Sequence, residues 1–141
     1  MIVLDTSAVL HVLTAPMPSL ELVERLERAR SRHAPHVIDL EFLHGIRRLV
    51  RYGELSEDRA NDVREDFDRL SLVRYPHVGL ADRIWSLRHN LTAYDACYVA
   101  LAEALGFPLV TSDERLGKAA NHAATVEVYP HSVAGPPGRP S

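Results

Sequence analysis

The sequence predicts an α/β fold, a three-layer α/β/α sandwich built around a central, mostly parallel sheet. Short apolar runs alternate along the chain with amphipathic helical patterns, which is typical of this class and not of a helical bundle. A length of 141 residues, 46% of them hydrophobic, fits one domain whose core needs no disulfide. The one cysteine cannot form an internal disulfide, and no run approaches the roughly 20 apolar residues of a membrane span. We therefore expect a soluble, cytoplasmic protein.

The first half of the chain predicts two strands and four helices. Four apolar residues precede Asp5, as in a buried strand, and Pro16 and Pro18 separate the first helix from the second. Gly53 ends the third helix, and Ser56 precedes the fourth. In order, we expect a strand over residues 1–4, helices over 7–13, 20–32 and 37–51, a helix after Ser56 and a strand over 72–75.

The second half predicts three helices and two strands, followed by a tail. Gly106 is a natural residue just beyond a helix end, because glycine readily adopts the left-handed conformation found there. In order, we expect a helix over residues 80–89, a helix from about 93 to Gly106, a strand over 107–111, a short helix over 114–120 and a strand over 126–129. Residues 1–130 then form the domain, and residues 131–141, with three prolines and two glycines, are expected to be a disordered tail.

The charge balance limits the kinds of partner. Sixteen basic residues stand against nineteen acidic ones, for a net charge of −3 at pH 7. This argues against a protein whose affinity for polyanions comes mainly from phosphate neutralisation. Committing four carboxylates to a divalent cation would leave the other charges almost balanced, so composition does not exclude a nuclease.

Four acidic residues fall where a parallel sheet would bring them together. Asp5 directly follows a predicted strand, and Asp113 follows another after two hydroxyl residues. Asp95 lies at the beginning of a predicted helix, and Glu41 lies in the first turns of a different one. Because ligands bind at the carboxyl ends of strands in open parallel sheets, the four acids could converge at that edge.

Each acid also has a simpler interpretation when it is taken alone. Asp5 and Asp113 fit helix caps, and Thr92 with Asp95 fits a capping box.

The third helix offers two acids, and its periodicity favours Asp39. A helical wheel puts the apolar centre near Phe42 and Ile46, with Asp39 nearer that face and Glu41 on the polar edge beside Arg48. Helical phase alone thus makes Asp39 the candidate and Glu41 a solvated residue.

The segments around these acids also match a known pattern in order and spacing. They are IVLDTSAVL at 2–10, Glu41 with Leu43, Gly45 and Ile46, LTAYDACYVALAEALG at 91–106, and LVTSDERL at 109–116. Together they resemble the PIN-domain family, and especially the VapC toxins of bacterial toxin–antitoxin pairs. By this resemblance the family's acidic quartet falls on Asp5, Glu41, Asp95 and Asp113. The family usually has Asn three positions after the helical glutamate, where this chain has His44, and this departure keeps Asp39 open.

The resemblance implies a metal-dependent endoribonuclease. The quartet would hold one or two Mg²⁺ or Mn²⁺ ions, which prefer oxygen ligands and activate water against a phosphodiester. Hydrolysis of RNA would leave 5′-phosphate and 3′-hydroxyl ends. The resemblance also implies a VapB-like antitoxin, whose C-terminal segment covers the acidic groove, and a homodimer.

Residues near the acids have supporting roles in this interpretation. Three hydroxyls would orient carboxylates or metal-bound water, those of Thr6, Ser7 and Thr111. Ser112 is interpreted as a helix cap, and Gly45 as leaving space for a metal and its waters. The candidate phosphate contacts are Arg115 and Lys118, with Arg83 and Arg88 as weaker ones.

Two other functions are weighed against the ribonuclease. A PIN module without catalysis could bind RNA or protein, but the presence of all four acids disfavours it. An enzyme with an Asp nucleophile also starts with Asp after a strand. Haloacid dehalogenase-type phosphatases need a second Asp two positions on, however, where this chain has Ser7. The helical stripe of Tyr94, Tyr98, Leu101 and Leu105 is interpreted as core and not as a platform for stacking bases.

Overall fold

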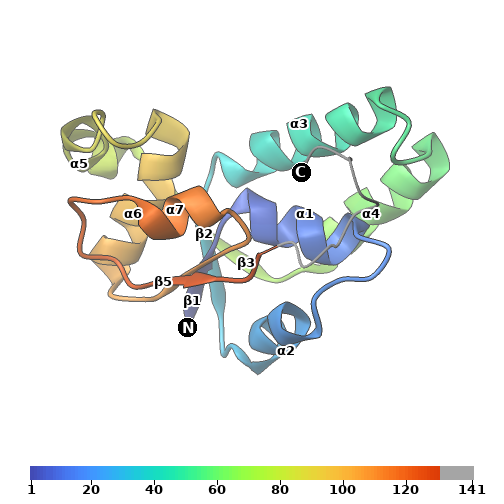
Figure 1. The fold of residues 1–141 in the computed structure, drawn as a ribbon, viewed down its shortest axis with the longest axis horizontal. Helices are drawn as coiled ribbons and strands as arrows, with labels where there is room; N and C mark the ends of the chain where they lie inside the picture. Colours follow the sequence, from blue (N-terminus) through green and yellow to red (C-terminus); the bar gives the residue numbers. More distant parts are fainter. Residues whose placement is uncertain (131–141) are drawn as a thin grey trace.

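The computed structural model describes residues 1–130 and contains a five-stranded, all-parallel sheet in the order β3-β2-β1-β4-β5. The strands are β1 (Ile2–Leu4), β2 (Arg32–Pro35), β3 (Leu72–Tyr75), β4 (Leu109–Thr111) and β5 (Val126–Val128). The helices are α1 (Thr6–Thr14), α2 (Leu20–Arg28), α3 (Ile38–Arg51), α4 (Glu57–Arg69), α5 (Ala81–Ser86), α6 (Ala93–Leu105) and α7 (Glu114–Lys118), with a 3₁₀ turn η1 at Val78–Leu80. In Figure 1, α1, α3 and α4 lie to one side of the central strands, and α5 and α6 lie to the other. The predicted sandwich is therefore confirmed, whereas the tail expected at residues 131–141 lies outside the described residues.

The strand β1 lies at the centre of the sheet, and its three apolar residues are fully buried. It pairs with β2 on one side and β4 on the other, with Leu4 opposite Val110. Since the strands are parallel, the residues that follow β1 and β4 meet at one edge of the sheet. The Asp5 N–H donates to the Val110 carbonyl at 3.2 Å, which extends this pairing beyond β1 itself.

The strand β2 is the main departure from the sequence prediction, which continues the second helix to residue 32. The helix α2 ends at Arg28, and Ala29 already has an extended backbone (φ −70°, ψ 133°). The next segment pairs with β1 and β3 at once, and the buried His33 ring lies 2.6 Å from the Ser31 hydroxyl and 2.7 Å from that of Tyr75. Pairing with two distant strands therefore overrides a local sequence that lacks the apolar alternation of a strand.

The other elements lie where the sequence predicts them, but several are shorter; the strand expected over residues 107–111, for example, begins at Leu109. The helix expected over residues 80–89 is the turn η1 followed by α5, which ends at Ser86, and α7 ends at Lys118. Ser56 and Thr92 cap α4 and α6 by accepting hydrogen bonds from backbone N–H groups of the first turns, and Gly106 ends α6 with φ 69°. Within residues 1–130, no helix is both long and apolar enough to cross a membrane.

Candidate functional site

Asp5 stands at the carboxyl end of β1 and is also the N-cap of α1. Its Oδ1 accepts hydrogen bonds from the Ala8 N–H (3.1 Å) and the Ser7 hydroxyl (2.7 Å), and its Oδ2 accepts one from the Thr111 hydroxyl (2.6 Å). The residue is only 6% exposed. Burial raises the pKa of Asp5 to about 6, although the three hydrogen bonds act in the opposite direction. Asp5 is thus a buried carboxylate at the sheet edge, and its capping bond does not exclude a further role.

Glu41 projects from α3 toward α1 and α6. Its Oε1 accepts hydrogen bonds from the hydroxyls of Thr6 (2.9 Å) and Tyr98 (2.6 Å), and these two hydroxyl oxygens lie 2.8 Å apart. Burial and the Glu41 charge raise the pKa of Tyr98 far above its usual value, so its hydroxyl stays protonated and donates. Side chains from α1, α3 and α6 therefore meet at one atom, Oε1 of Glu41.

Sequence reasoning treats Tyr98 only as part of an apolar stripe. Tyr98 is indeed 2% exposed, but a buried tyrosine hydroxyl requires a hydrogen-bond partner, and here that partner is the carboxylate of Glu41. The available signal was its position on α6, one turn after Asp95.

Asp95 and Asp113 extend the acidic edge to α6 and α7. Asp95 lies in the first turn of α6, where its N–H donates to the Thr92 hydroxyl at 3.2 Å. Burial raises the pKa of Asp95, and the charges of Asp113 and Glu41 raise it further. Asp113 is the N-cap of α7, and the Arg115 side chain pairs with both of its oxygens at 3.2 and 3.0 Å, which lowers the pKa of Asp113.

Asp39 points to a different partner. The Arg74 side chain on β3 donates to both of its oxygens, at 2.7 and 2.9 Å, and the Asp39 side chain is 43% exposed. Helical phase therefore identifies an acid that faces the edge strand β3, whereas Glu41 is the α3 acid that contacts α1 and α6.

The space expected beside Gly45 is filled by protein. A Cβ atom at this position would lie 2.5 Å from Leu10 Cδ1. The expectation that Gly45 makes room for a metal and its waters is therefore wrong, because the close approach of α3 to α1 uses that room.

The hydroxyl residues lie among the acids. The hydroxyls of Thr6, Ser7 and Thr111 bond to carboxylate oxygens as described above, and Ser7 Oγ also accepts the Ser112 N–H at 3.0 Å. Ser112 itself is not the cap of α7, since Asp113 takes that place. The Ser112 hydroxyl is instead buried without a hydrogen-bond partner among the described residues.

The candidate phosphate contacts have different surroundings. Arg115 is engaged with Asp113, although its side chain is 87% exposed, while Lys118 is exposed in the last turn of α7. Arg83 makes two hydrogen bonds to the Glu103 carboxylate, at 2.8 and 2.9 Å. Arg88 lies with its guanidinium 4.5 Å from the centre of the Trp85 ring.

The donor atoms at this edge suit a hard divalent cation. They are carboxylate and hydroxyl oxygens, which Mg²⁺ and Mn²⁺ prefer. The acids repel one another, and the buried hydroxyl of Ser112, the residue before Asp113, has no hydrogen-bond partner within the described chain. Across residues 1–130, no three His, Cys, Asp or Glu side chains are arranged to hold one ion directly. The oxygen donors at this edge fit such a cation by their chemistry, since Mg²⁺ in proteins usually binds through one or two carboxylates and keeps several waters.

Comparisons with known proteins identify a family by sequence and a shared fold by structure. The sequence profile of the PIN domain matches residues 2–122. Ribonuclease VapC9 of Mycobacterium tuberculosis is 42% identical over 130 residues, which cover 92% of this chain and 99% of that protein. A DNA-bound VapBC from Salmonella typhimurium shares the fold with a TM-score of 0.67 at 18% identity, over 90% of this chain and 96% of that one. So does VapC20 of Mycobacterium tuberculosis, described as a sarcin-ricin loop cleaving toxin, with a TM-score of 0.61 at 15% identity, over 84% and 94% of the two chains.

Proposed function

This chain belongs to the PIN-domain family, and from that membership we propose that it is a VapC-type ribonuclease, the toxin of a toxin–antitoxin pair. A relative that bears the name ribonuclease aligns along almost its whole length. The proposal includes a small VapB-like antitoxin that covers the acidic edge, a homodimer and a cytoplasmic location. The shared fold with a VapBC assembly supports the antitoxin.

One observation carries the catalytic part of the proposal: Asp95 interacts electrostatically with each of the other three acids. Its charge raises the pKa of Asp5, and the charges of Asp113 and Glu41 raise the pKa of Asp95 itself. Such mutual repulsion is unfavourable for folding alone and is typical of sites that bind a cation or perform chemistry. We therefore assign Asp5, Glu41, Asp95 and Asp113 to catalysis and metal binding.

One or two Mg²⁺ or Mn²⁺ ions held by these carboxylates would supply a water of lowered pKa and neutralise charge on the attacked phosphate. The chain itself orients the ligands. Tyr98 and Thr6 hold Glu41 Oε1, and Ser7 and Thr111 each hold one oxygen of Asp5. Water would add to phosphorus and the 3′ oxygen would leave, which produces 5′-phosphate and 3′-hydroxyl ends. Arg115 and Lys118 on α7 are our candidates for contacts to RNA phosphates.

The alternative of an Asp nucleophile is less compatible with the site. A nucleophilic carboxylate must reach the phosphorus atom with a free oxygen. Both oxygens of Asp5 accept hydrogen bonds from the protein, and the residue is only 6% exposed. A tetrahedral phosphorus centre therefore has less access to it than a small cation, which can share an oxygen that already accepts one bond.

The proposal is tested with Asp95→Asn, which keeps the shape of the side chain and removes its charge. We expect Mn²⁺-dependent cleavage of single-stranded RNA to fall at least about 100-fold, with a melting temperature in EDTA that is not lowered, because the substitution relieves repulsion among the acids. Asp58→Asn is the matched control, because Asp58 also lies in the first turn of a helix, α4, and is exposed. Undiminished Mn²⁺-dependent cleavage by folded Asp95→Asn protein would overturn the assignment.

A further inference from the structure

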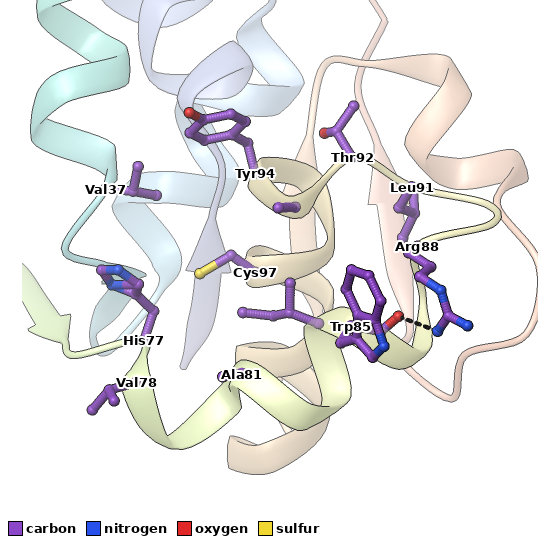
Figure 2. A pocket seen from close by; sticks show the side chains of 12 residues that line it. Val37, His77, Val78, Ala81, Trp85, Arg88, Leu91, Thr92, Tyr94 and Cys97 are labelled. Carbon is purple, nitrogen blue, oxygen red and sulfur yellow. Dashed lines mark hydrogen bonds between the residues drawn. The ribbon is translucent and has the colours of Figure 1, made fainter.

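A groove of about 770 Å³ lies between α5, the segment before it and the start of α6 (Figure 2). We propose that this groove binds an unpaired base of the RNA next to the bond that is cleaved, an inference that rests on the ribonuclease function proposed above. Its two large aromatic side chains, Trp85 and Tyr94, are 68% and 60% exposed. The interpretation of Tyr94 as core is thus wrong, because α6 becomes buried only from Ala96 onward.

The groove borders the acidic edge through residues of α6 and the start of α3. Tyr94, which lines it, immediately precedes Asp95 on α6. Val37, on its opposite side, accepts the Glu41 N–H at 3.0 Å through its carbonyl. Cys97 also lines the groove, on the same helix as Asp95. An RNA strand whose phosphate lies at the acids would therefore pass its neighbouring base over this groove.

The chemistry of the lining favours a base. The walls are mostly apolar and aromatic, and no carboxylate of residues 1–130 lines them. The Arg88 guanidinium lies over the indole of Trp85, 4.5 Å from the ring centre, and brings a positive charge to the rim. Stacking on aromatic rings beside an arginine is the usual way that proteins bind unpaired bases. The volume lies within the ~300–1,000 Å³ range of small-ligand sites.

The chain contains a single tryptophan, Trp85, so its fluorescence reports on the groove directly. The full chain with Asp95→Asn, in Mg²⁺, is titrated with a single-stranded oligoribonucleotide and with an abasic strand of equal length. We expect the first strand to quench Trp85 fluorescence and the abasic strand to bind without quenching. Binding is followed in parallel by the anisotropy of a label on the RNA.

The outcomes separate the two proposals. If both strands bind and neither changes the fluorescence, the groove does not hold a base, while the ribonuclease proposal stands on the cleavage assay. If the fluorescence depends on protein concentration and not on RNA, the groove is covered by a second copy of the chain, and the inference is wrong. If the wild-type chain neither binds nor cleaves any RNA, both proposals are overturned.

Tyr94→Ala provides a second test that leaves the reporter in place. We expect it to weaken binding of the oligoribonucleotide at least about fivefold, to leave binding of the abasic strand unchanged, and to raise KM more than it lowers kcat. Tyr94→Phe should restore binding, because the stacking ring is kept. Tyr52→Ala is the matched control, since Tyr52 is 68% exposed at the end of α3, outside the groove. Equal effects of Tyr94→Ala on both strands would contradict the inference.

Discussion

The hydroxyl of Tyr98 lies 2.6 Å from Oε1 of Glu41, although 57 residues separate them in the sequence. Since α6 also carries Asp95, this bond ties the orientation of Glu41 on α3 to the helix that carries a second acid of the site. Together with the bond from Thr6, this part-buried hydrogen bond restricts the Glu41 side chain to one direction.

Tyr98→Phe removes this bond while it keeps the ring in the core. We expect cleavage and Mn²⁺ affinity to fall several-fold, because Glu41 retains only the Thr6 hydroxyl, and stability to fall by about 1 kcal/mol. Tyr75→Phe is the matched control: it removes a bond of similar length, 2.7 Å to His33, in which none of the four acids takes part. Thermal melts and Mn²⁺ titrations of both variants make the comparison. If the Tyr98 hydroxyl had only a structural role, Tyr98→Phe and Tyr75→Phe would lose the same amount of stability and both would keep the Mn²⁺ affinity of the wild type.

Glu41→Gln and Asp39→Asn distinguish the two acids of α3. We expect Glu41→Gln to reduce Mn²⁺ affinity and cleavage strongly, because its carboxylate lies with Thr6 and Tyr98. Asp39→Asn weakens the partly exposed pair with Arg74, which is worth about 0–1 kcal/mol, and should leave Mn²⁺ affinity unchanged. Isothermal titration with Mn²⁺ decides between them. Weakened binding in Asp39→Asn alone would make helical phase the better guide at this helix.

The distinction shows what the sequence could and could not predict about the site. Periodicity places Asp39 toward the apolar side of α3. It cannot predict that the Arg74 side chain of β3 donates hydrogen bonds to both oxygens of this carboxylate. The bonds of Glu41 come from α1 and α6, so they depend on packing between elements that are distant in the chain. Motif resemblance selected Glu41, which contacts α1 and α6, whereas phase alone assigned it to solvent.

The fold was largely predictable because most boundaries carry local signals. Caps at Ser56 and Thr92 and the left-handed Gly106 mark helix ends through their own side chains or backbone. β2 carries no such signal, since its buried His33 is satisfied by Ser31 and Tyr75, and its strand conformation comes from pairing on both sides. Local sequence therefore predicts the elements that stabilise their own ends and misses the one that depends on its neighbours.

Gly45→Ala tests the packing of α3 on α1. The new methyl group would lie 2.5 Å from Leu10 Cδ1, the flexible end of a side chain, so Leu10 must shift. Overpacking typically costs about 1–3 kcal/mol, and the better helix propensity of alanine offsets up to about 1 kcal/mol of it. We expect a net loss near 1 kcal/mol with unchanged Mn²⁺ affinity, measured by denaturant unfolding and metal titration. Gly79→Ala, where a Cβ meets nothing within 4 Å, should show no such loss. Weaker Mn²⁺ binding by Gly45→Ala would restore this glycine to the metal site.

Asp5→Asn tests the burial of a charge at the sheet edge. In the metal-free protein the Asp5 pKa is about 6, against 3.8 for an unperturbed aspartate, because burial disfavours the charged form. Between these pH values the folded state holds a proton that the unfolded state has lost, so the free energy of unfolding falls as pH rises from about 4 to about 6. The full penalty above pH 6 is at most about 3 kcal/mol.

Asparagine caps a helix as well as aspartate does, so Asp5→Asn keeps the cap and removes the charge, while the bond to Thr111 reverses because the new amide NH2 donates to the hydroxyl. In EDTA we therefore expect the variant to be more stable than the wild type at pH 7.5, by about 1–2 kcal/mol, and to show almost no difference at pH 4. Mn²⁺ should reverse the order at pH 7.5, because an ion that binds only the folded wild-type site stabilises that protein by mass action. Denaturant melts at the two pH values, with and without Mn²⁺, test all three statements. A variant that is less stable than the wild type in EDTA at pH 7.5 would mean that the bonds from Ser7 and Thr111 outweigh the desolvation of the charge. The Asp5 carboxylate would then contribute to folding and would not be an unfavourable charge that a cation relieves.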